Sequence, residues 1–356
     1  MEAWEGQSLP LLDNKKAEER RVFTVFSTGC SPFQDWQSQT LIYNHRKLGI
    51  KGDVVRLMAC DDPNYVLPNH SYEKYRVVRT PDFDVDFSDD KYSPRNRPGG
   101  LDYWLNWRSN DTDVPLDDDV LIMVDPDMVF LTNHIDVNNV TRGFGIGSLY
   151  GLGKNWPKDE FAQKSCNGKC KDLEDGYNPS FGHPMVLTAG DTRIHAPVWM
   201  NVTEQMRKLI KKWETDMFSN VISHILLDIQ IDVLSTMLSY VDVESDEPWD
   251  IVQWNAEPRS PGVWVAHYCQ TYTIGNFSWS KHDKNPIDLR QCNRSMIFPE
   301  PKKEALVEME HWRNFPLRSS ATSSKEDVMR SRNVWMLDKT WDHARHAINA
   351  YYEEFC

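Results

Sequence analysis

The segment that most constrains the fold of this chain is an uninterrupted apolar run, Val120-Leu121-Ile122-Met123-Val124, which ends directly in Asp125-Pro126-Asp127. A run without polar residues is typical of a central parallel strand that is buried on both faces of a sheet. In open α/β sheets, ligands bind where the carboxyl ends of such strands meet. The run therefore predicts an α/β fold with a site at the two aspartates.

Strand and helix patterns alternate along most of the chain. Runs rich in β-branched and aromatic residues predict further strands at 22–26, 54–58, 75–78, 182–187 and 264–267. Apolar residues at helical spacing predict helices at 35–48, 100–107, 203–213 and 222–238. Residues 94–100 combine Pro with Gly and are predicted to form a loop. This order indicates an α/β sheet with right-handed crossovers, flanked by helices.

Composition divides the chain into three parts. Residues 1–20 form a polar, charged leader without an apolar signal core. Residues 21–300 carry the alternating pattern and are predicted to be one α/β domain. Residues 301–356 are charged and largely helical, and are predicted to be a C-terminal extension. No stretch approaches the ~20 apolar residues that span a bilayer, so we expect no transmembrane segment in this chain.

The acidic balance, a formal net charge of -13, argues against nucleic acid as a partner, because phosphate contacts need a surplus of Lys and Arg. It fits a neutral or basic acceptor, or serves solubility alone. The 14 Trp residues fit two roles, an ordinary buried core or stacking surfaces for sugars or prolines. Composition leaves both alternatives open.

Cysteines and sequons together favour a secretory lumen (ER or Golgi), although the polar leader leaves a cytoplasmic location open. Cys166 and Cys170 enclose a turn-like Asn-Gly-Lys with no second Cys/His pair at metal spacing, which indicates a local disulfide or two free thiols. In an oxidising compartment we expect Cys30 to pair with Cys60 and Cys269 with Cys292, because each pair flanks elements that should be neighbours. The six Asn-x-Ser/Thr sequons are at Asn69, Asn110, Asn139, Asn201, Asn276 and Asn293.

Asp125 and Asp127 are the strongest candidates for metal ligands. Two carboxylates one residue apart at the end of a buried strand can face one cation, and hard oxygen ligands favour Mg²⁺ or Mn²⁺. Such a cation would clamp a nucleotide diphosphate. His267 follows a late apolar run, and its imidazole suits Mn²⁺ as a further ligand. A solvated acidic turn and a hydrogen-bonded structural histidine are the alternatives.

Two further groups could serve the same site. Within Asn96-Arg97-Pro98-Gly99-Gly100, the glycines would let the backbone approach a ligand, and Arg97 could pair with phosphate. Asp228 and Asp232 fall on the helix predicted at 222–238, where an acid among apolar residues needs a partner or a cavity. A plain turn and a solvated helix face are the respective alternatives.

Several short motifs occur in a characteristic order along the chain. They are Gln34-Asp35-Trp36-Gln37, Leu57-Met58-Ala59-Cys60, Asn96-Arg97-Pro98, Trp104-Leu105, Asp125-Pro126-Asp127-Met128, Ala196-Pro197-Val198-Trp199-Met200-Asn201-Val202-Thr203, His267-Tyr268, Ile274-Gly275-Asn276-Phe277-Ser278 and Cys292-Asn293-Arg294. This order resembles one family, the plant and algal peptidyl serine α-galactosyltransferases and the related hydroxyproline O-arabinosyltransferases, over roughly residues 21–300. The motifs around Gly275 and Cys292 are closer to the galactosyltransferases, and 196–202 is closer to the arabinosyltransferases.

The resemblance implies a GT-A-type, Rossmann-like sheet, a UDP-sugar donor (galactose or arabinofuranose), a divalent metal, and retention of anomeric configuration. It implies an acceptor hydroxyl on serine or hydroxyproline in hydroxyproline-rich proteins. Carried over by motif, Asp125 and Asp127 match the metal and donor motif, and His267 matches the late metal-site histidine. Asn96, Arg97 and Pro98 match a donor-side loop. Asp232 falls near a helical acid of the family, and we expect it to orient the donor sugar or to stabilise charge at the anomeric carbon.

Two other classes of function compete with a transferase. A non-catalytic sugar- or peptide-binding relative would be expected to lose Asp125, Asp127 or His267, and all three are present. Another Asp-x-Asp metalloenzyme, such as a phosphohydrolase, would be expected to carry more ligand clusters near later strands. A transferase of the same fold with a different acceptor is a third alternative. Retention can arise from front-face attack, which we favour, or from double displacement, for which Asp232 is the candidate nucleophile.

Overall fold

The computed structural model describes residues 20–84, 90–106, 111–171, 177–254, 262–283, 287–293, 298–313, 315–318 and 323–356. The leader predicted at 1–20 lies outside the described residues except for Arg20, and so does the sequon at Asn110. The other five sequon asparagines are exposed. Among the helices in the described ranges, none is both long and apolar enough to cross a bilayer.

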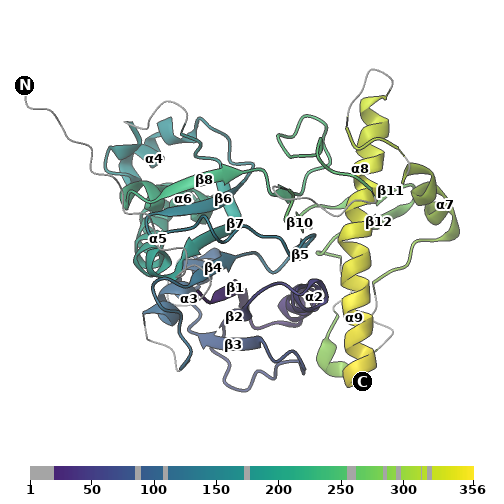
Figure 1. Cartoon of the computed structure of the whole chain (residues 1–356), viewed down its shortest axis with the longest axis horizontal. Coiled ribbons are helices and arrows are strands. Elements are labelled where there is room, and N and C mark those ends of the chain that lie inside the picture. Colours follow the sequence, from purple (N-terminus) through teal and green to yellow (C-terminus); the bar gives the residue numbers. More distant parts are fainter. Residues whose placement is uncertain are drawn as a thin grey trace, which may run out of the picture.

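A seven-stranded sheet in the order β3-β2-β1-β4-β7-β6-β8 forms the centre of the molecule (Figure 1). β1 to β4 run parallel, β7 is antiparallel to both β4 and β6, and β8 lies parallel to β6 at the edge. The predicted α/β class is confirmed. The strands are β1 (Val22–Gly29), β2 (Asp53–Ala59), β3 (Tyr75–Thr80), β4 (Val120–Met123), β6 (Phe144–Leu149), β7 (Phe181–Thr188) and β8 (Gln230–Leu234).

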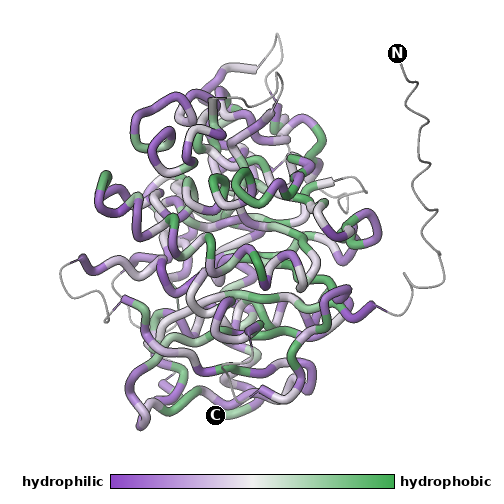
Figure 2. The backbone as a smooth tube through the Cα atoms, turned by 90° about the vertical axis from the view of Figure 1, so that its left-hand side faces the viewer, coloured by the Kyte–Doolittle hydropathy of each residue, from purple (hydrophilic) through white to green (hydrophobic). Residues whose placement is uncertain are grey.

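Helices cover both faces of this sheet because its central strands are apolar on both sides. In β4, Leu121 and Met123 pack in one core with side chains of α3, α5 and α6, while Val120 and Ile122 pack in another core with α2. Figure 2 shows the hydrophobic segments gathered inside the molecule. These helices are α2 (Pro32–Leu48), α3 (Asn96–Leu105), α5 (Ala189–Leu209) and α6 (Thr215–Leu226).

A second, three-stranded sheet lies beside α2 and continues the chain directly from the acidic turn. β5 (Met128–Phe130) pairs antiparallel with β10 (Val265–His267), which pairs with β9 (Met237–Leu238). The register places His267 opposite Met128. Strand β10 therefore ends next to the turn that follows β4.

The C-terminal segment packs on the opposite side of α2 from the main sheet. In Figure 1, α8 (Lys325–Lys339) and α9 (Trp341–Phe355) follow one another as a long column, with α7 (Lys303–Trp312) beside them. Their core includes Trp335 and Trp341 from these helices and Trp36 from α2. The helices therefore share a core with the element that borders the site.

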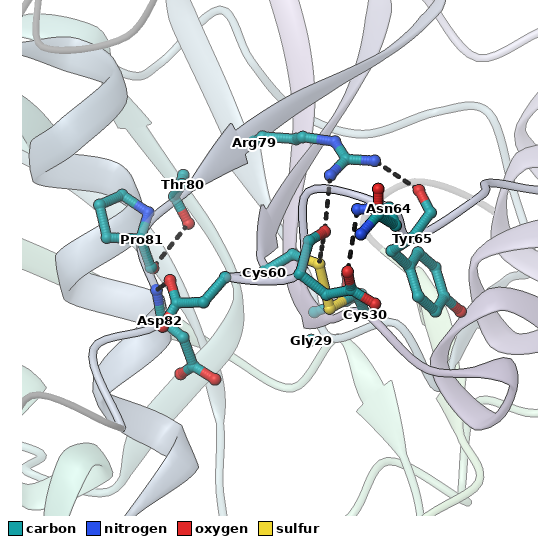
Figure 3. The surroundings of a disulfide bond; sticks show 12 residues. Gly29, Cys30, Cys60, Asn64, Tyr65, Arg79, Thr80, Pro81 and Asp82 are labelled. Carbon is teal, nitrogen blue, oxygen red and sulfur yellow. Dashed lines mark hydrogen bonds between the residues drawn. A yellow bond between two sulfur atoms is a disulfide. The ribbon is translucent and has the colours of Figure 1, made fainter.

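Three disulfides are present, and one of the two predicted long-range pairings is wrong. Cys30–Cys60 is confirmed, and it joins the carboxyl ends of β1 and β2, where Arg79 donates hydrogen bonds to two carbonyls of the following loop (Figure 3). The local Cys166–Cys170 bridge is also formed. Cys292 pairs with Cys356 instead of Cys269, which is a free thiol. The C-terminal helix places Cys356 next to Cys292. The two residues are far apart in sequence, so the sequence pattern did not predict this pairing.

Two predicted elements are also wrong. The loop expected at 94–100 is helical, because α3 begins at Asn96 and a proline is tolerated in the first turn of a helix. Its glycines allow close packing, since a Cβ at Gly99 would lie 2.5 Å from the ring of Phe83. The helix expected at 222–238 ends at Leu226, and β8 follows after a left-handed residue, Asp228 (φ 55°).

Candidate active site

The acidic turn at the end of β4 is buried, as the sequence predicted for a site rather than for a solvated turn. Asp125 and Asp127 are only 3% and 4% exposed. Met128 closes the turn by donating its backbone N–H to the carbonyl of Asp125 (3.2 Å). Two buried carboxylates so close together require cationic or hydrogen-bonding partners.

The β5–β10 ladder positions His267 against Asp127. Its Nε2 lies 3.2 Å from the Asp127 Oδ2, and the backbone N–H of Tyr268 donates to the Asp127 carbonyl (3.0 Å). One ligand atom from each of Asp125, Asp127 and His267 lies within 4.8 Å of the others. The structure therefore brings together the three residues that the sequence suggested as metal ligands.

Arg97 connects Asp125 to a second buried acid. From the first turn of α3, it pairs with Asp125 Oδ1 (2.9 Å) and, through its other terminal nitrogen, with Asp216 Oδ2 (3.0 Å) at the start of α6. Asp216 also accepts a hydrogen bond from the hydroxyl of Tyr92 (3.0 Å). The guanidinium thus fixes α3 and α6 relative to the acidic turn.

Two more basic side chains complete the surroundings, and no sequence pattern indicated either of them. His183 Nδ1, from β7, lies 3.2 Å from Asp125 Oδ1. Lys281, from the segment after β12 (Phe277–Trp279), contacts Asp127 Oδ2 through its ammonium group. Both come from elements far from β4 in sequence, so only the fold associates them with the aspartates.

The partners determine the ionisation of these groups. Burial acts to raise the pKa of Asp125, but Arg97 and His183 more than offset this effect and hold the pKa below its ordinary value. Burial acts in the same way on Asp127, where His267 and Lys281 lower the pKa. Burial alone would lower the pKa of His267, yet Asp127 raises it well above its ordinary value. These ion pairs therefore favour the anionic form of both carboxylates and the cationic form of His267.

The donor set fits a divalent cation. Two anionic carboxylates and an imidazole offer oxygen and nitrogen ligands of the kind that Mn²⁺ and Mg²⁺ accept. Hydrogen bonds and ion pairs reach Oδ1 of Asp125 and Oδ2 of Asp127, so each carboxylate has a second oxygen to present. Coordination through Nε2 would require His267 to lose its proton. The Lys281 ammonium beside Asp127 would also oppose the charge of the cation.

The two aspartates and His267 line a cleft with a volume of about 720 Å³. The carboxyl ends of β1 and β4, the start of α3 and the segment after β6 all contribute to its wall. Tyr150 also lines the cleft, with the centroid of its ring 6.2 Å from that of His267. A cleft of this size and composition can hold a small organic ligand next to a metal.

The other predicted site residues are divided between the cleft and the rest of the molecule. Asn96 and Arg97 line the cleft, whereas Pro98 is buried within α3 and is not part of the lining. Asp232 lies exposed on β8, the edge strand of the main sheet, and is not among the lining residues. It lies on a strand instead of the predicted helix, and the structure does not bring it to the acidic turn.

A free thiol and a carboxyl group lie near His267. The Cys269 sulfur lies 2.9 Å from the Ser239 hydroxyl. Burial would raise the pKa of this thiol, but His267 more than offsets it and lowers the pKa. Glu247 accepts hydrogen bonds from the backbone N–H groups of Ser239 and Tyr240, and burial raises its pKa to about 7.

Comparison with known proteins finds relatives that are named as sugar transferases. No protein-family model matches the chain. A peptidyl serine α-galactosyltransferase of Arabidopsis thaliana is 26% identical over 301 residues, which are 79% of this chain and 34% of that protein. One of Chlamydomonas reinhardtii is 30% identical over 140 residues, 38% of this chain and 18% of that protein. The chain thus spans about a third or less of the length of these relatives.

Among solved structures, the galactosyltransferase LgtC, crystallised with donor and acceptor sugar analogs, is similar to this chain with a TM-score of 0.42 at 11% identity. The similarity covers 70% of this chain and 87% of that one.

Proposed function

We propose that this chain, a relative of the peptidyl serine α-galactosyltransferases, is a metal-dependent glycosyltransferase with a GT-A-type fold. It transfers a sugar from a UDP-sugar donor to a hydroxyl group of a protein or peptide. The observation that carries the proposal is the buried Asp125-Asp127-His267 group at the wall of a cleft. Galactose is the donor sugar that the names of the relatives favour, and serine is the acceptor residue.

The residues of the cleft suit the binding of a nucleotide diphosphate. Asp125, Asp127 and His267 would hold Mn²⁺ or Mg²⁺, which neutralises the negative charge of the leaving diphosphate. Lys281 lines the same cleft, so its ammonium group can turn from Asp127 to a phosphate oxygen. Arg97 is held by two carboxylates, and its role in the proposal is to orient Asp125.

The proposal includes retention of configuration by front-face attack. Double displacement needs a protein carboxylate in contact with the anomeric carbon. Asp232 was the candidate for that nucleophile, and its place on the exposed edge strand supports neither this role nor the orientation of the sugar. In front-face attack the leaving phosphate accepts the proton of the acceptor hydroxyl, so no such carboxylate is needed.

An oxidising compartment of the secretory pathway is part of the proposal. The Cys30–Cys60 and Cys292–Cys356 disulfides support it, because disulfides persist where thiols are not kept reduced. The five exposed sequon asparagines in the described part of the chain are consistent with it.

Release of UDP tests the activity. The protein is incubated with Mn²⁺ and each of several UDP-sugars, with and without a serine-containing, proline-rich peptide. We expect one donor, UDP-galactose first, to give UDP release that the peptide increases. No release from any UDP-sugar, with or without peptide, would contradict the proposal.

Asp127→Asn is the matching variant. It removes one anionic ligand and the partner of Lys281 and His267. We expect UDP affinity in the presence of Mn²⁺ to fall by about 100-fold or more, the size of a lost electrostatic contact. Calorimetric titration of UDP measures it. Asp232→Asn is the control, because its exposed side chain lies outside the cleft, and it should bind UDP like the wild type.

A further inference from the structure

Exposed aromatic side chains occur at one place on the described part of the molecule. The chain contains 14 Trp, 14 Phe and 13 Tyr, and nearly all those described are buried or half-buried. Phe33, Trp213 and Tyr240, exposed by 36%, 63% and 43%, are the aromatic residues among the large exposed hydrophobic ones, and all three line the cleft. Aromatic rings left in water around a cleft indicate a binding surface rather than packing.

The strand order separates Phe33 from Tyr240. Phe33 lies at the start of α2, just after β1, and stacks with His282 (centroids 5.9 Å apart). Tyr240 lies near Gly151, which follows β6, since a Cβ on that glycine would be 3.8 Å from the tyrosine ring. β4, which ends in the acidic turn, lies between β1 and β6 in the sheet. Phe33 therefore lies on the β1 side of the aspartates and Tyr240 on the other.

Trp213 and Tyr240 are held in place through their backbones. The Trp213 carbonyl lies 2.5 Å from the hydroxyl of Tyr92, whose one proton is shared between this carbonyl and Asp216. The Trp213 and Tyr92 rings meet edge to face at 6.2 Å. The Tyr240 N–H donates to the Glu247 carboxyl (2.9 Å). A backbone that is fixed before a ligand arrives loses little conformational freedom on binding.

The cleft also contains acidic groups that the cluster does not use. Its cations are engaged, because Arg97 pairs with Asp125 and Asp216, and Lys281 contacts Asp127. Glu214, next to Trp213, is exposed and lines the cleft. Asp82 and Asp84 also line it, and they accept hydrogen bonds from neutral donors. A surface that combines carboxylates with Trp and Tyr attracts Lys and Arg side chains through both charge and cation–π contacts.

We propose that Trp213, Tyr240 and Glu214 form the acceptor subsite, and that they bind an extended peptide with Lys or Arg beside the hydroxyl residue. This proposal rests on the proposed function. It adds that the acceptor peptide carries positive charge next to the residue that receives the sugar. The rings stack on the peptide backbone, on proline rings or on the alkyl part of Lys and Arg. Glu214 attracts the charge, and the donor binds on the β1 side.

Peptide binding tests this subsite without turnover. The probes are a proline-rich peptide with one serine and two lysines, and the same peptide with glutamines in place of the lysines. We expect the lysine peptide to bind wild-type protein at least about tenfold more tightly than the glutamine peptide. Trp213→Ala and Tyr240→Ala should each weaken binding of the lysine peptide about tenfold, and Glu214→Gln should remove most of the preference for lysine.

Two controls show whether these losses belong to an acceptor subsite. Leu209→Ala removes an exposed hydrophobic side chain at the end of α5 that does not line the cleft, and it should bind both peptides normally. UDP affinity with Mn²⁺ should be unchanged in Trp213→Ala and Tyr240→Ala. If either variant lost as much affinity for UDP as for the peptide, the rings would belong to the donor site and the proposal would be overturned. Wild-type affinity for the peptide in both variants would also overturn it. Tight binding of the lysine peptide without UDP release from any donor would instead contradict the transferase function alone.

Discussion

At the scale of single residues, Lys281 adds a second positive charge, beside His267, at the acidic turn. Its ammonium contacts the same Asp127 oxygen that faces His267 Nε2. Burial would lower the pKa of Lys281, but Asp127 more than offsets this effect and raises it. The ion pair therefore favours the charged ammonium, which would oppose the binding of a metal ion at Asp127.

Lys281→Met should consequently strengthen the binding of Mn²⁺ in the absence of nucleotide. Loss of one charge-assisted contact of about 1.5 kcal/mol corresponds to about a tenfold lower Kd. Electron paramagnetic resonance of free Mn²⁺ measures this Kd. Lys169→Met, which removes a surface lysine paired with Asp228, should leave the Kd unchanged. Weaker Mn²⁺ binding in Lys281→Met would show that the lysine supports the site instead of competing for it.

At the scale of elements, the segment that follows β9 depends on one half-buried carboxyl group, that of Glu247. Glu247 accepts the backbone N–H groups of Ser239 and Tyr240, so it holds the segment that carries the exposed Tyr240 ring. Burial raises its pKa from 4.5 to about 7. Between these two values the folded state binds more protons than the unfolded state, so the free energy of unfolding falls as pH rises from about 4.5 to about 7.

Glu247→Gln should remove this pH dependence and keep both backbone hydrogen bonds. The shift of roughly 2.5 units corresponds to about 3 kcal/mol, most of it lost between about pH 5 and about pH 8. Urea unfolding of both proteins at these two pH values measures the difference. An equal pH dependence in the wild type and the variant would mean that another group is responsible.

The sequence predicted correctly those elements whose burial produces a clear pattern of apolar residues. The run at 120–124 contains only apolar residues because β4 is covered on both faces, and the acidic pair follows it directly. The helix predicted at 222–238 was wrong because apolar residues continue past Leu226, and the break depends on one left-handed residue, Asp228. His183 and Lys281 could not be predicted as partners of the aspartates, because tertiary contacts alone bring them there. The role predicted for Asp232 depended on a helix in the related family, but in this structure the residue lies on the strand β8.

At the scale of the whole molecule, the C-terminal helices are tied to the part that carries the site. α9 packs on α2, and Trp36 of α2 lies in the same core as Trp335 and Trp341. The Cys292–Cys356 disulfide fixes the end of α9 across a sequence separation of 64 residues. Undocking of α9 would therefore expose the core beneath α2, next to the second sheet.

Replacement of both Cys292 and Cys356 by Ser should lower the free energy of unfolding by about 4 kcal/mol, as expected from chain entropy for a loop of this length. Guanidinium unfolding under non-reducing conditions measures it. Cys269→Ser, which removes the free thiol, should have a much smaller effect. A double variant as stable as the wild type would show that packing alone holds α9.

Mass spectrometry of an acceptor peptide tests the central claim most directly. The protein is incubated with UDP-galactose, Mn²⁺ and a proline-rich peptide that contains serine and lysine, and the products are compared with and without a chelator. We predict that the peptide gains one hexose on serine, that the chelator abolishes the gain, and that excess Mn²⁺ restores it. Undiminished transfer in the chelator would contradict the metal role of Asp125, Asp127 and His267, and the absence of transfer from every UDP-sugar would contradict the enzyme itself.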